Sequence, residues 1–236
     1  MNTSSQSLPL ICLLGGSFNP PHAGHFRIAI ETYEALSPSG VLFLPCATPP
    51  HKSADNLLSF EFRVALLRAA LAEAGLDESF GVCEVENERS GPSYTVETLA
   101  ILAKRRPDQR LAFIMGGEDY AHLATWKGWR ELPDLADLVV LSRGDKGREA
   151  FHAATRLLWP EARAEDSVFS AVTDVFVLPG GGRLLFLPQP LLEISSSLVR
   201  ERWLQGRHLD FLVPNSIQIL LNEQKRTIRE LWKSFP

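Results

Sequence analysis

The sequence predicts an α/β fold: a doubly wound, mostly parallel, Rossmann-like sheet flanked by helices, with a small C-terminal helical part. Two observations support this prediction. Apolar runs of strand length alternate with longer stretches of helical period through most of the chain. The first of these runs ends at Gly15 and Gly16 and leads through a tight turn into a helix, which is the kind of junction at which such sheets bind ligands. We therefore expect a core over residues 1–190 and a helical segment packed on it over residues 191–236.

The individual elements follow from the same patterns. Strands are expected at residues 10–14, 41–45, 80–85, 110–115, 138–141 and 183–187. Helices are expected at residues 25–36, 60–74, 95–105, 196–205, 216–222 and 223–232. Ser93 is the expected N-cap of the helix that starts at residue 95, and a basic end at residues 104–106 suits the dipole of that helix.

Residues 144–182 have a less regular pattern. They contain a helical stretch around residues 148–158, an apolar run at 168–178 and three consecutive glycines at 180–182. Both an insertion and a contact between copies in a homo-oligomer fit this segment.

Composition sets limits on function. The chain has 236 residues, 45% hydrophobic and 22% charged, as in ordinary globular proteins. A net charge of −4 gives no global attraction for nucleic acid or an anionic membrane, so neither is expected as a partner. The three cysteines, Cys12, Cys46 and Cys83, are far apart in apolar runs and are expected to be buried thiols. Residues 1–14 do not resemble a signal or membrane segment, so a cytoplasmic location is expected.

The turn after the first strand indicates a site for nucleotide phosphates. It reads Gly15-Gly16-Ser17-Phe18-Asn19-Pro20-Pro21-His22-Ala23-Gly24-His25. Small residues let the backbone approach a phosphate, the helix start offers N–H groups, and the two histidines add side-chain donors. The run lacks the Lys-Ser/Thr of a P-loop and the third glycine of the dinucleotide fingerprint.

A second candidate anion site lies near the C-terminus. Ser195, Ser196 and Ser197 open a predicted helix, and Arg200 follows one turn later on the face of Ser196 and Ser197. Hydroxyl groups, helix-start N–H groups and a guanidinium together can bind an anion. Taken alone, an ordinary serine cap followed by a solvated arginine explains the same residues.

Both runs resemble motifs of the nucleotidylyltransferase superfamily: G-[TS]-F-[DN]-P-x-H-x-G-H for the first and I-S-S-[TS]-x-x-R for residues 194–200. Three runs between them narrow the resemblance: Pro49-Pro50-His51-Lys52, Ser93-Tyr94-Thr95 and Gly116-Gly117-Glu118-Asp119, with Trp126 soon after the last. In this order they resemble the bacterial nicotinate-nucleotide adenylyltransferases, from about residue 10 to residue 202.

The resemblance implies adenylyl transfer from ATP to nicotinate mononucleotide, with release of pyrophosphate and with Mg²⁺ carried on the triphosphate. It implies catalytic roles for His22, His25 and Arg200. The implied ATP-binding residues are Gly15, Gly16, Ser17, Phe18, His22, His25, Ser195, Ser197 and Arg200. The implied residues for the second substrate are His51, Lys52, Ser93, Tyr94, Thr95, Glu118, Asp119 and Trp126.

Within the second set, the resemblance implies that the amides of Tyr94 and Thr95 meet the pyridine carboxylate and that Trp126 stacks on the ring. It also implies that either Glu118 or Asp119 binds ribose hydroxyls. No protein metal site is expected. Two alternatives remain: a related transferase acting on phosphopantetheine or nicotinamide mononucleotide, and a nucleotide-binding sensor without catalytic activity.

Overall fold

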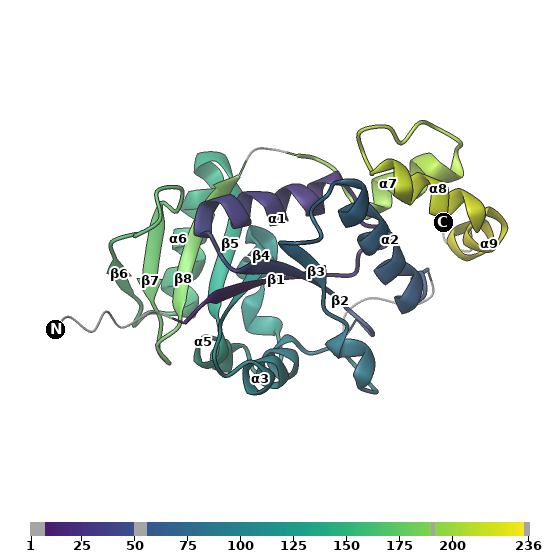
Figure 1. Ribbon diagram of the computed structural model, residues 1–236. Helices are drawn as coiled ribbons and strands as arrows, with labels where there is room; N and C mark the ends of the chain where they lie inside the picture. Colours follow the sequence, from purple (N-terminus) through teal and green to yellow (C-terminus); the bar gives the residue numbers. More distant parts are fainter. Residues whose placement is uncertain (1–7, 50–55, 190–191, 234–236) are drawn as a thin grey trace.

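The computed structural model describes residues 8–49, 56–189 and 192–233, and the statements below concern these residues. They contain an eight-stranded sheet in the order β3-β2-β1-β4-β5-β8-β7-β6 (Figure 1). The strands are β1 Leu10–Gly16, β2 Gly40–Pro45, β3 Phe80–Val82, β4 Arg110–Gly116, β5 Asp137–Arg143, β6 Arg163–Glu165, β7 Asp174–Val177 and β8 Arg183–Gln189. Neighbours from β3 to β8 are parallel, whereas β7 pairs with β8 and β6 in antiparallel register. The predicted doubly wound, mostly parallel sheet is therefore confirmed.

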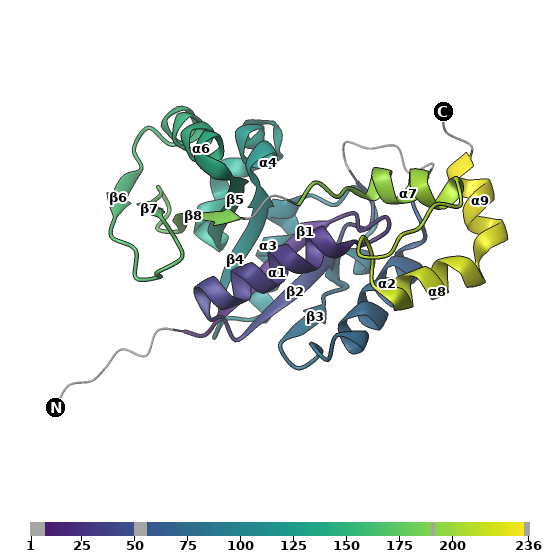
Figure 2. The ribbon, with the colours of Figure 1, turned by 90° about the horizontal axis from the view of Figure 1, so that it is seen from above.

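Helices cover both faces of the sheet (Figures 1 and 2). On one face lie α1 Ala23–Leu36 and α2 Phe60–Glu73, and on the other lie α3 Thr95–Arg105, α5 Leu132–Leu135 and α6 Gly144–Leu158. Alternate residues of β1 supply the two cores: Ile11 and Leu13 pack with α3, while Cys12 and Leu14 pack with α1. A strand buried on both faces needs a continuous apolar run, which explains why this one reads so clearly in the sequence.

The C-terminal part is helical, as predicted. Its helices are α7 Ser196–Leu204, α8 Asn215–Glu223 and α9 Lys225–Lys233, at the right of Figure 1. They share a separate hydrophobic cluster with α2, in which Leu66 packs with residues such as Trp203 and Ile217. This cluster holds the serine-rich motif at the start of α7 beside the main sheet.

The six expected strands and six expected helices are all present, with small differences at their ends. The strand that begins at Phe80 ends at Val82 instead of residue 85, because the chain turns into a 3₁₀ helix over Val85–Glu88. The helix around residues 148–158 begins earlier, at Gly144, and is followed by the strands β6 and β7. Residues 144–182 thus lengthen the sheet by two strands. The short helical turns α4 Gly117–Ala121, Leu123–Thr125 and Trp129–Glu131 were not predicted.

Two local predictions are wrong. Ser93 does not cap α3: the N-cap position is Tyr94, and the Ser93 hydroxyl instead accepts hydrogen bonds from the backbone N–H groups of Ala47 and Thr48. Of the three cysteines only Cys12 is buried, while Cys46 and Cys83 are half-buried because they follow strand ends. None of the three forms a disulfide.

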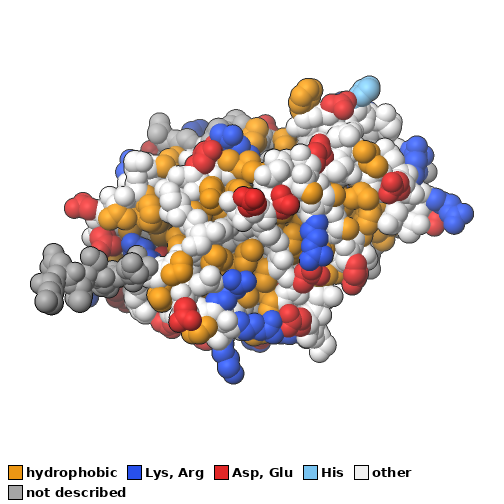
Figure 3. Space-filling model, viewed as in Figure 1, with side chains coloured by type: hydrophobic (Ala, Val, Ile, Leu, Met, Phe, Trp, Pro, Cys, Tyr) orange, Lys and Arg blue, Asp and Glu red, His pale blue; other side chains and the backbone are white. Residues whose placement is uncertain are grey.

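No helix in the described part of the chain is long and apolar enough to cross a membrane. On the face shown in Figure 3, acidic and basic side chains are interspersed and form no large area of one sign.

Candidate active site

The turn after β1 lies at the carboxyl end of a central strand, with β2 on one side and β4 on the other. Its two glycines make room for aromatic rings. A Cβ on Gly15 would stand 3.0 Å from the Phe113 ring, and one on Gly16 would stand 3.0 Å from the Phe18 ring. Phe18 is fully buried in a left-handed backbone conformation, with φ of 48°. The buried ring of Phe18 thus fixes where the chain turns away from the sheet.

Side chains from elsewhere hold three carbonyl groups of this turn. Arg63 Nη1 donates to the Ser17 oxygen at 2.8 Å. Arg200 Nη1 donates to the Asn19 oxygen at 2.8 Å, and Ser196 Oγ donates to the Pro20 oxygen at 2.9 Å. The two motifs that the sequence singled out at opposite ends of the chain are therefore in direct contact.

His22 and His25 lie side by side at the start of α1, with ring centroids 3.7 Å apart. The backbone N–H of His22 donates to Nδ1 of His25 at 3.1 Å. Because Nδ1 of His25 accepts this hydrogen bond, the proton of the neutral ring is on Nε2, which is left as a donor. The Phe18 ring contacts His25 edge-on at 4.9 Å and helps to orient it.

Burial keeps both rings neutral at pH 7. It lowers the pKa of His22 to about 4. Burial, together with the neighbouring His22 ring, also lowers the pKa of His25 well below its ordinary value of 6.5. A neutral imidazole donates one hydrogen bond without carrying a full charge, so these residues are suited to orient phosphate oxygens rather than to neutralise them.

Few N–H groups at the start of α1 are available to a ligand, contrary to what the sequence suggested. The N–H of Ala23 donates to the Leu212 oxygen at 2.8 Å, in the loop between α7 and α8. The N–H of His25 donates to the His22 oxygen at 2.9 Å, and that of His22 is used as described above. The C-terminal helices thus cover this helix end, and side chains and the preceding turn are left to bind an anion.

The residues of the serine-rich motif make different contacts. Ser195 caps α7, since its Oγ accepts from the N–H of Leu198 at 3.2 Å. Ser197 Oγ accepts from Arg200 Nη2 at 3.0 Å. Arg200 is half-buried, and desolvation lowers its pKa, although a guanidinium stays charged at any ordinary pH. Arg200 and Ser197 therefore form one unit beside the first motif.

A second group of predicted residues lies at the start of α3. Tyr94 is the N-cap and Thr95 the first residue, and both are half-buried. Within the described residues, the N–H groups of Thr95 and Val96 have no hydrogen-bond partner. Lys127 Nζ lies 4.3 Å from the centre of the Tyr94 ring and pairs with the Glu97 carboxylate of the same helix turn at 2.6 Å. This helix start can accept an anion.

Trp126 lies between the start of α3 and the turn after β1, and it contacts the Phe113 ring. It is half-buried, and its ring lies 6.1 Å from that of Phe113, which also packs on Gly15. Glu118 and Asp119 are both exposed in the first turn of α4. Only Asp119 folds back over the end of β4, with Oδ2 3.7 Å from where a Cβ on Gly116 would stand. His51 and Lys52 lie outside the described residues.

Three residues that were assigned no role from the sequence contact the two ends of the β2–α2 connection. At its beginning, the buried Glu86 carboxylate accepts from the N–H of Ala47 at 3.2 Å. At its end, Asn19 donates to the Asn56 oxygen at 2.9 Å and accepts from the Leu58 N–H at 3.0 Å. Arg63 also donates to Leu58, through Nε. An arginine on a largely apolar helix was the only signal in the sequence that could have pointed to this anchor.

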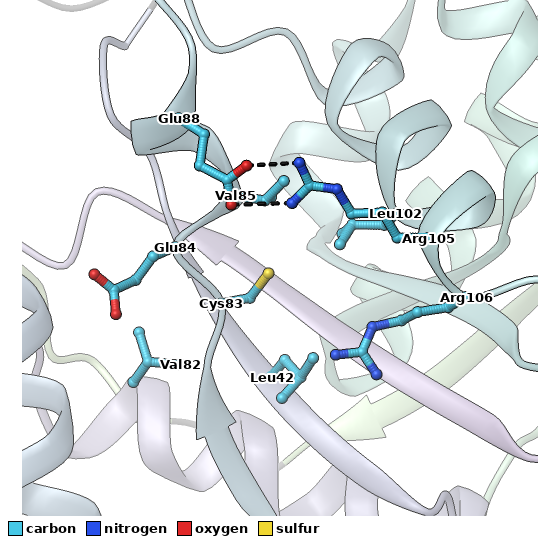
Figure 4. Close-up of a pocket in the computed structure, with 9 residues that line it drawn as sticks. All are labelled: Leu42, Val82, Cys83, Glu84, Val85, Glu88, Leu102, Arg105 and Arg106. Carbon is cyan, nitrogen blue, oxygen red and sulfur yellow. Dashed lines mark hydrogen bonds and ion pairs between the residues drawn. The ribbon is translucent and has the colours of Figure 1, made fainter.

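The cavity in Figure 4 is a different feature. It has a volume of about 460 Å³ and lies between β3 and α3, beside the ion pair of Arg105 with Glu88. None of the predicted site residues lines it.

The fold and the two joined motifs define a nucleotidyltransferase, and comparison with known proteins agrees. Residues 13–202 match the cytidylyltransferase-like family, and the chain belongs to this family. The relatives along the whole chain narrow the assignment to its nicotinate-nucleotide adenylyltransferase branch. The probable nicotinate-nucleotide adenylyltransferase of Maridesulfovibrio salexigens is 34% identical over 94% of this chain and 99% of its own length. That of Trichlorobacter lovleyi is 35% identical over 90% of this chain and 96% of its own.

A solved structure supports the fold. The Plasmodium falciparum nicotinic acid mononucleotide adenylyltransferase, complexed with NaAD, superposes with a TM-score of 0.67 and 15% identity. The match covers 93% of this chain and 98% of the other.

Proposed function

We propose that this protein transfers the adenylyl group of ATP to nicotinate mononucleotide, forming nicotinate adenine dinucleotide and pyrophosphate in NAD biosynthesis. The observation that supports this most is the contact of Arg200 and Ser196 with the turn that carries His22 and His25. It brings one cation and two neutral donors to the carboxyl end of the central strand, where an α/β sheet binds nucleotides.

The reaction needs positioning more than acid–base catalysis. The phosphate of nicotinate mononucleotide attacks the α-phosphorus in line, and the bond to the pyrophosphate oxygen breaks. A phosphomonoester has a second pKa near 6, so the nucleophile is mostly dianionic at pH 7 without a base. The protein must hold two polyanions together and stabilise charge on the transferred phosphoryl group.

Each group at the turn has a role in this proposal. Nε2–H of His25 and the ring of His22 donate to phosphate oxygens, and the half-buried guanidinium of Arg200 balances the charge that develops on the leaving pyrophosphate. The backbone of residues 15–18 lines the same site, with Ser197 fixing the guanidinium. Ser195 contributes indirectly, as the cap of α7.

The start of α3 would recognise the second substrate. The backbone amides of Tyr94 and Thr95 bind the pyridine carboxylate, and Trp126 stacks on the cationic ring. Ser93 positions this helix start by tying it to Ala47 and Thr48. Asp119 is the better candidate for the ribose hydroxyls, because its carboxylate lies over the end of β4 and Glu118 has no such contact. His51 and Lys52 remain assigned to the phosphates from the resemblance alone.

Proteins of this family typically use a divalent metal ion with the nucleotide. The described residues contain no group of three or more His, Cys, Asp or Glu side chains able to hold such an ion. We expect Mg²⁺ to be ligated mainly by triphosphate oxygens and water, as is usual for this ion on a nucleotide. The ion would offset phosphate charge, and the protein would bind the complex through the residues above.

We further propose that residues 1–190 form the catalytic core and that residues 191–236 complete the site from its side. A cytoplasmic location, a homo-oligomer and the absence of nucleic-acid or membrane partners are the expectations that accompany this function.

The test is pyrophosphate release from ATP and Mg²⁺ with three acceptors: nicotinate mononucleotide, nicotinamide mononucleotide and phosphopantetheine. We expect strong preference for the first. Equal use of both pyridine nucleotides would remove the role given to the start of α3. Turnover with phosphopantetheine alone would overturn the substrate assignment. No pyrophosphate release with any of the three acceptors, in a protein that binds ATP, would favour a nucleotide-binding sensor.

A further inference from the structure

Arg63 lies under the first motif, where a charged side chain is unusual. It belongs to the first turn of α2 and is 1% exposed, among the most deeply buried side chains of the protein. Its Nη1 donates to the Ser17 oxygen at 2.8 Å and its Nε to the Leu58 oxygen at 3.0 Å. Its guanidinium also lies 5.4 Å from the centre of the Phe60 ring. One side chain thus joins the phosphate turn to the end of the β2–α2 connection.

The charge of Arg63 is not neutralised by contact. Within the described residues, no carboxylate forms an ion pair with it. Glu61 and Glu86 act on the guanidinium only through longer-range electrostatics. The Glu86 carboxylate, in the 3₁₀ helix after β3, accepts hydrogen bonds from the Ala47 N–H and the Thr98 hydroxyl. A buried cation without a carboxylate in contact is costly, so a fold gains little stability from it. A bound polyanion would supply the missing negative charge.

The contact with Ser17 also sets the direction of two peptide groups. The C=O and N–H of a trans peptide point in opposite directions. The Gly16 oxygen accepts from the Cys46 N–H at 2.9 Å, and the Ser17 oxygen accepts from Arg63. The N–H groups of Ser17 and Phe18 therefore point away from these partners, and neither has a hydrogen-bond partner in the described ranges. Successive backbone N–H groups of this kind are the donors from which anion-binding concavities are built.

We propose that Arg63 is a positioning residue for the phosphate site: it holds the Ser17 carbonyl inward so that the Ser17 and Phe18 amides face the triphosphate, and it adds a buried positive charge beneath them. This inference rests on the proposed function, which places the triphosphate at this turn. Arg63 does not touch the reacting atoms itself.

The test compares Arg63→Met with Arg63→Lys. Met fills much of the same volume without charge or donors, whereas Lys keeps the charge and cannot bridge two carbonyls in the same way. Arg68→Met is the matched control, because Arg68 lies on the same helix, is exposed and pairs with Glu84. Binding of tripolyphosphate and of ATP is measured by calorimetry, and KM for each substrate is measured separately. Circular dichroism reports the fold.

We expect Arg63→Met to weaken tripolyphosphate and ATP binding by about 10- to 100-fold, as for loss of hydrogen bonds to a charged group. KM for nicotinate mononucleotide should stay within about twofold of wild type, a split that a general loss of structure would not produce. Arg63→Lys should fall between Arg63→Met and wild type, and Arg68→Met should match wild type.

Tripolyphosphate needs no acceptor, so this arm is independent of the proposed reaction. Failure of wild type to turn over nicotinate mononucleotide would overturn the proposed function, while the binding arm would still test Arg63. A folded Arg63→Met protein with wild-type tripolyphosphate affinity would overturn the inference, as would a wild type that binds no tripolyphosphate. If Arg63→Met does not fold, Arg63→Lys decides: weaker binding supports the inference and unchanged binding refutes it.

Discussion

Arg200 Nη1 donates a hydrogen bond of 2.8 Å to the carbonyl oxygen of Asn19, across 181 residues of sequence. The same guanidinium donates to Ser197 Oγ through Nη2, so it is fixed on both sides. This contact, with that of Ser196 to Pro20, joins the C-terminal helices to the turn after β1. The proposed site therefore combines two segments that are far apart in the sequence.

Replacing Arg200 tests whether its guanidinium acts on the substrate phosphates. We expect Arg200→Ala to lower kcat/KM for ATP by about 100- to 1000-fold, the usual loss when one preorganised donor to developing charge is removed. Glu201→Gln, an exposed change on the same helix, is the control and should retain activity. Steady-state pyrophosphate release measures both. Activity near wild type in a folded Arg200→Ala protein would remove this residue from the site.

His25 should contribute through Nε2–H alone. We expect His25→Ala to lose about 2.7–4 kcal/mol of transition-state stabilisation in kcat, with its circular dichroism unchanged, and His22→Ala to behave similarly. His208→Ala is the control, since that histidine is almost fully exposed and pairs only with Asp210. Near-normal turnover by the folded His25→Ala protein would contradict the assignment.

The buried histidines should also make stability depend on pH. The pKa of His22 is about 4 in the folded protein, below the ordinary 6.5 of the unfolded chain, so the unfolded state binds more protons between these values. Stability from this residue is fully present above pH 6.5 and is lost as the pH falls to about 4, by roughly 3 kcal/mol.

Urea unfolding at pH 7 and pH 4.5 measures this loss. It should be smaller in His22→Gln than in wild type, and unchanged in His208→Gln, which alters an exposed histidine. An equal loss in all three proteins would mean that His22 does not titrate as described.

Trp126 should act on the acceptor side. We expect Trp126→Ala to raise KM for nicotinate mononucleotide by about 3- to 30-fold, in line with roughly 0.5–2 kcal/mol for a cation stacked on indole. Trp126→Phe keeps a ring and should lose less. KM for ATP is measured in parallel, and an equal increase there would indicate that Trp126 only supports the packing of Phe113.

Much of the fold was predictable because each central strand is buried on both faces and leaves a continuous apolar run, as β1 does. The strands β6 and β7 were missed because they are short, and β6, at the edge of the sheet, has all three residues exposed. Ser93 was assigned as a helix cap from its position, yet its hydroxyl is used by the loop at Ala47 and Thr48. A serine near a helix start has several possible partners, and only packing selects among them.

The fold class, the two motifs and the kind of chemistry that they indicate could be predicted from the sequence, because periodicity, turn residues and motif spacing are local properties of the chain. The contacts of those residues depend on tertiary structure. The tautomer of His25, the covering of Ala23 by Leu212, and the hold of Arg63 on Ser17 all depend on segments distant in sequence. Such contacts arise only when the whole sheet and its helices have packed, because side-chain direction and burial are set by neighbours that no local pattern records.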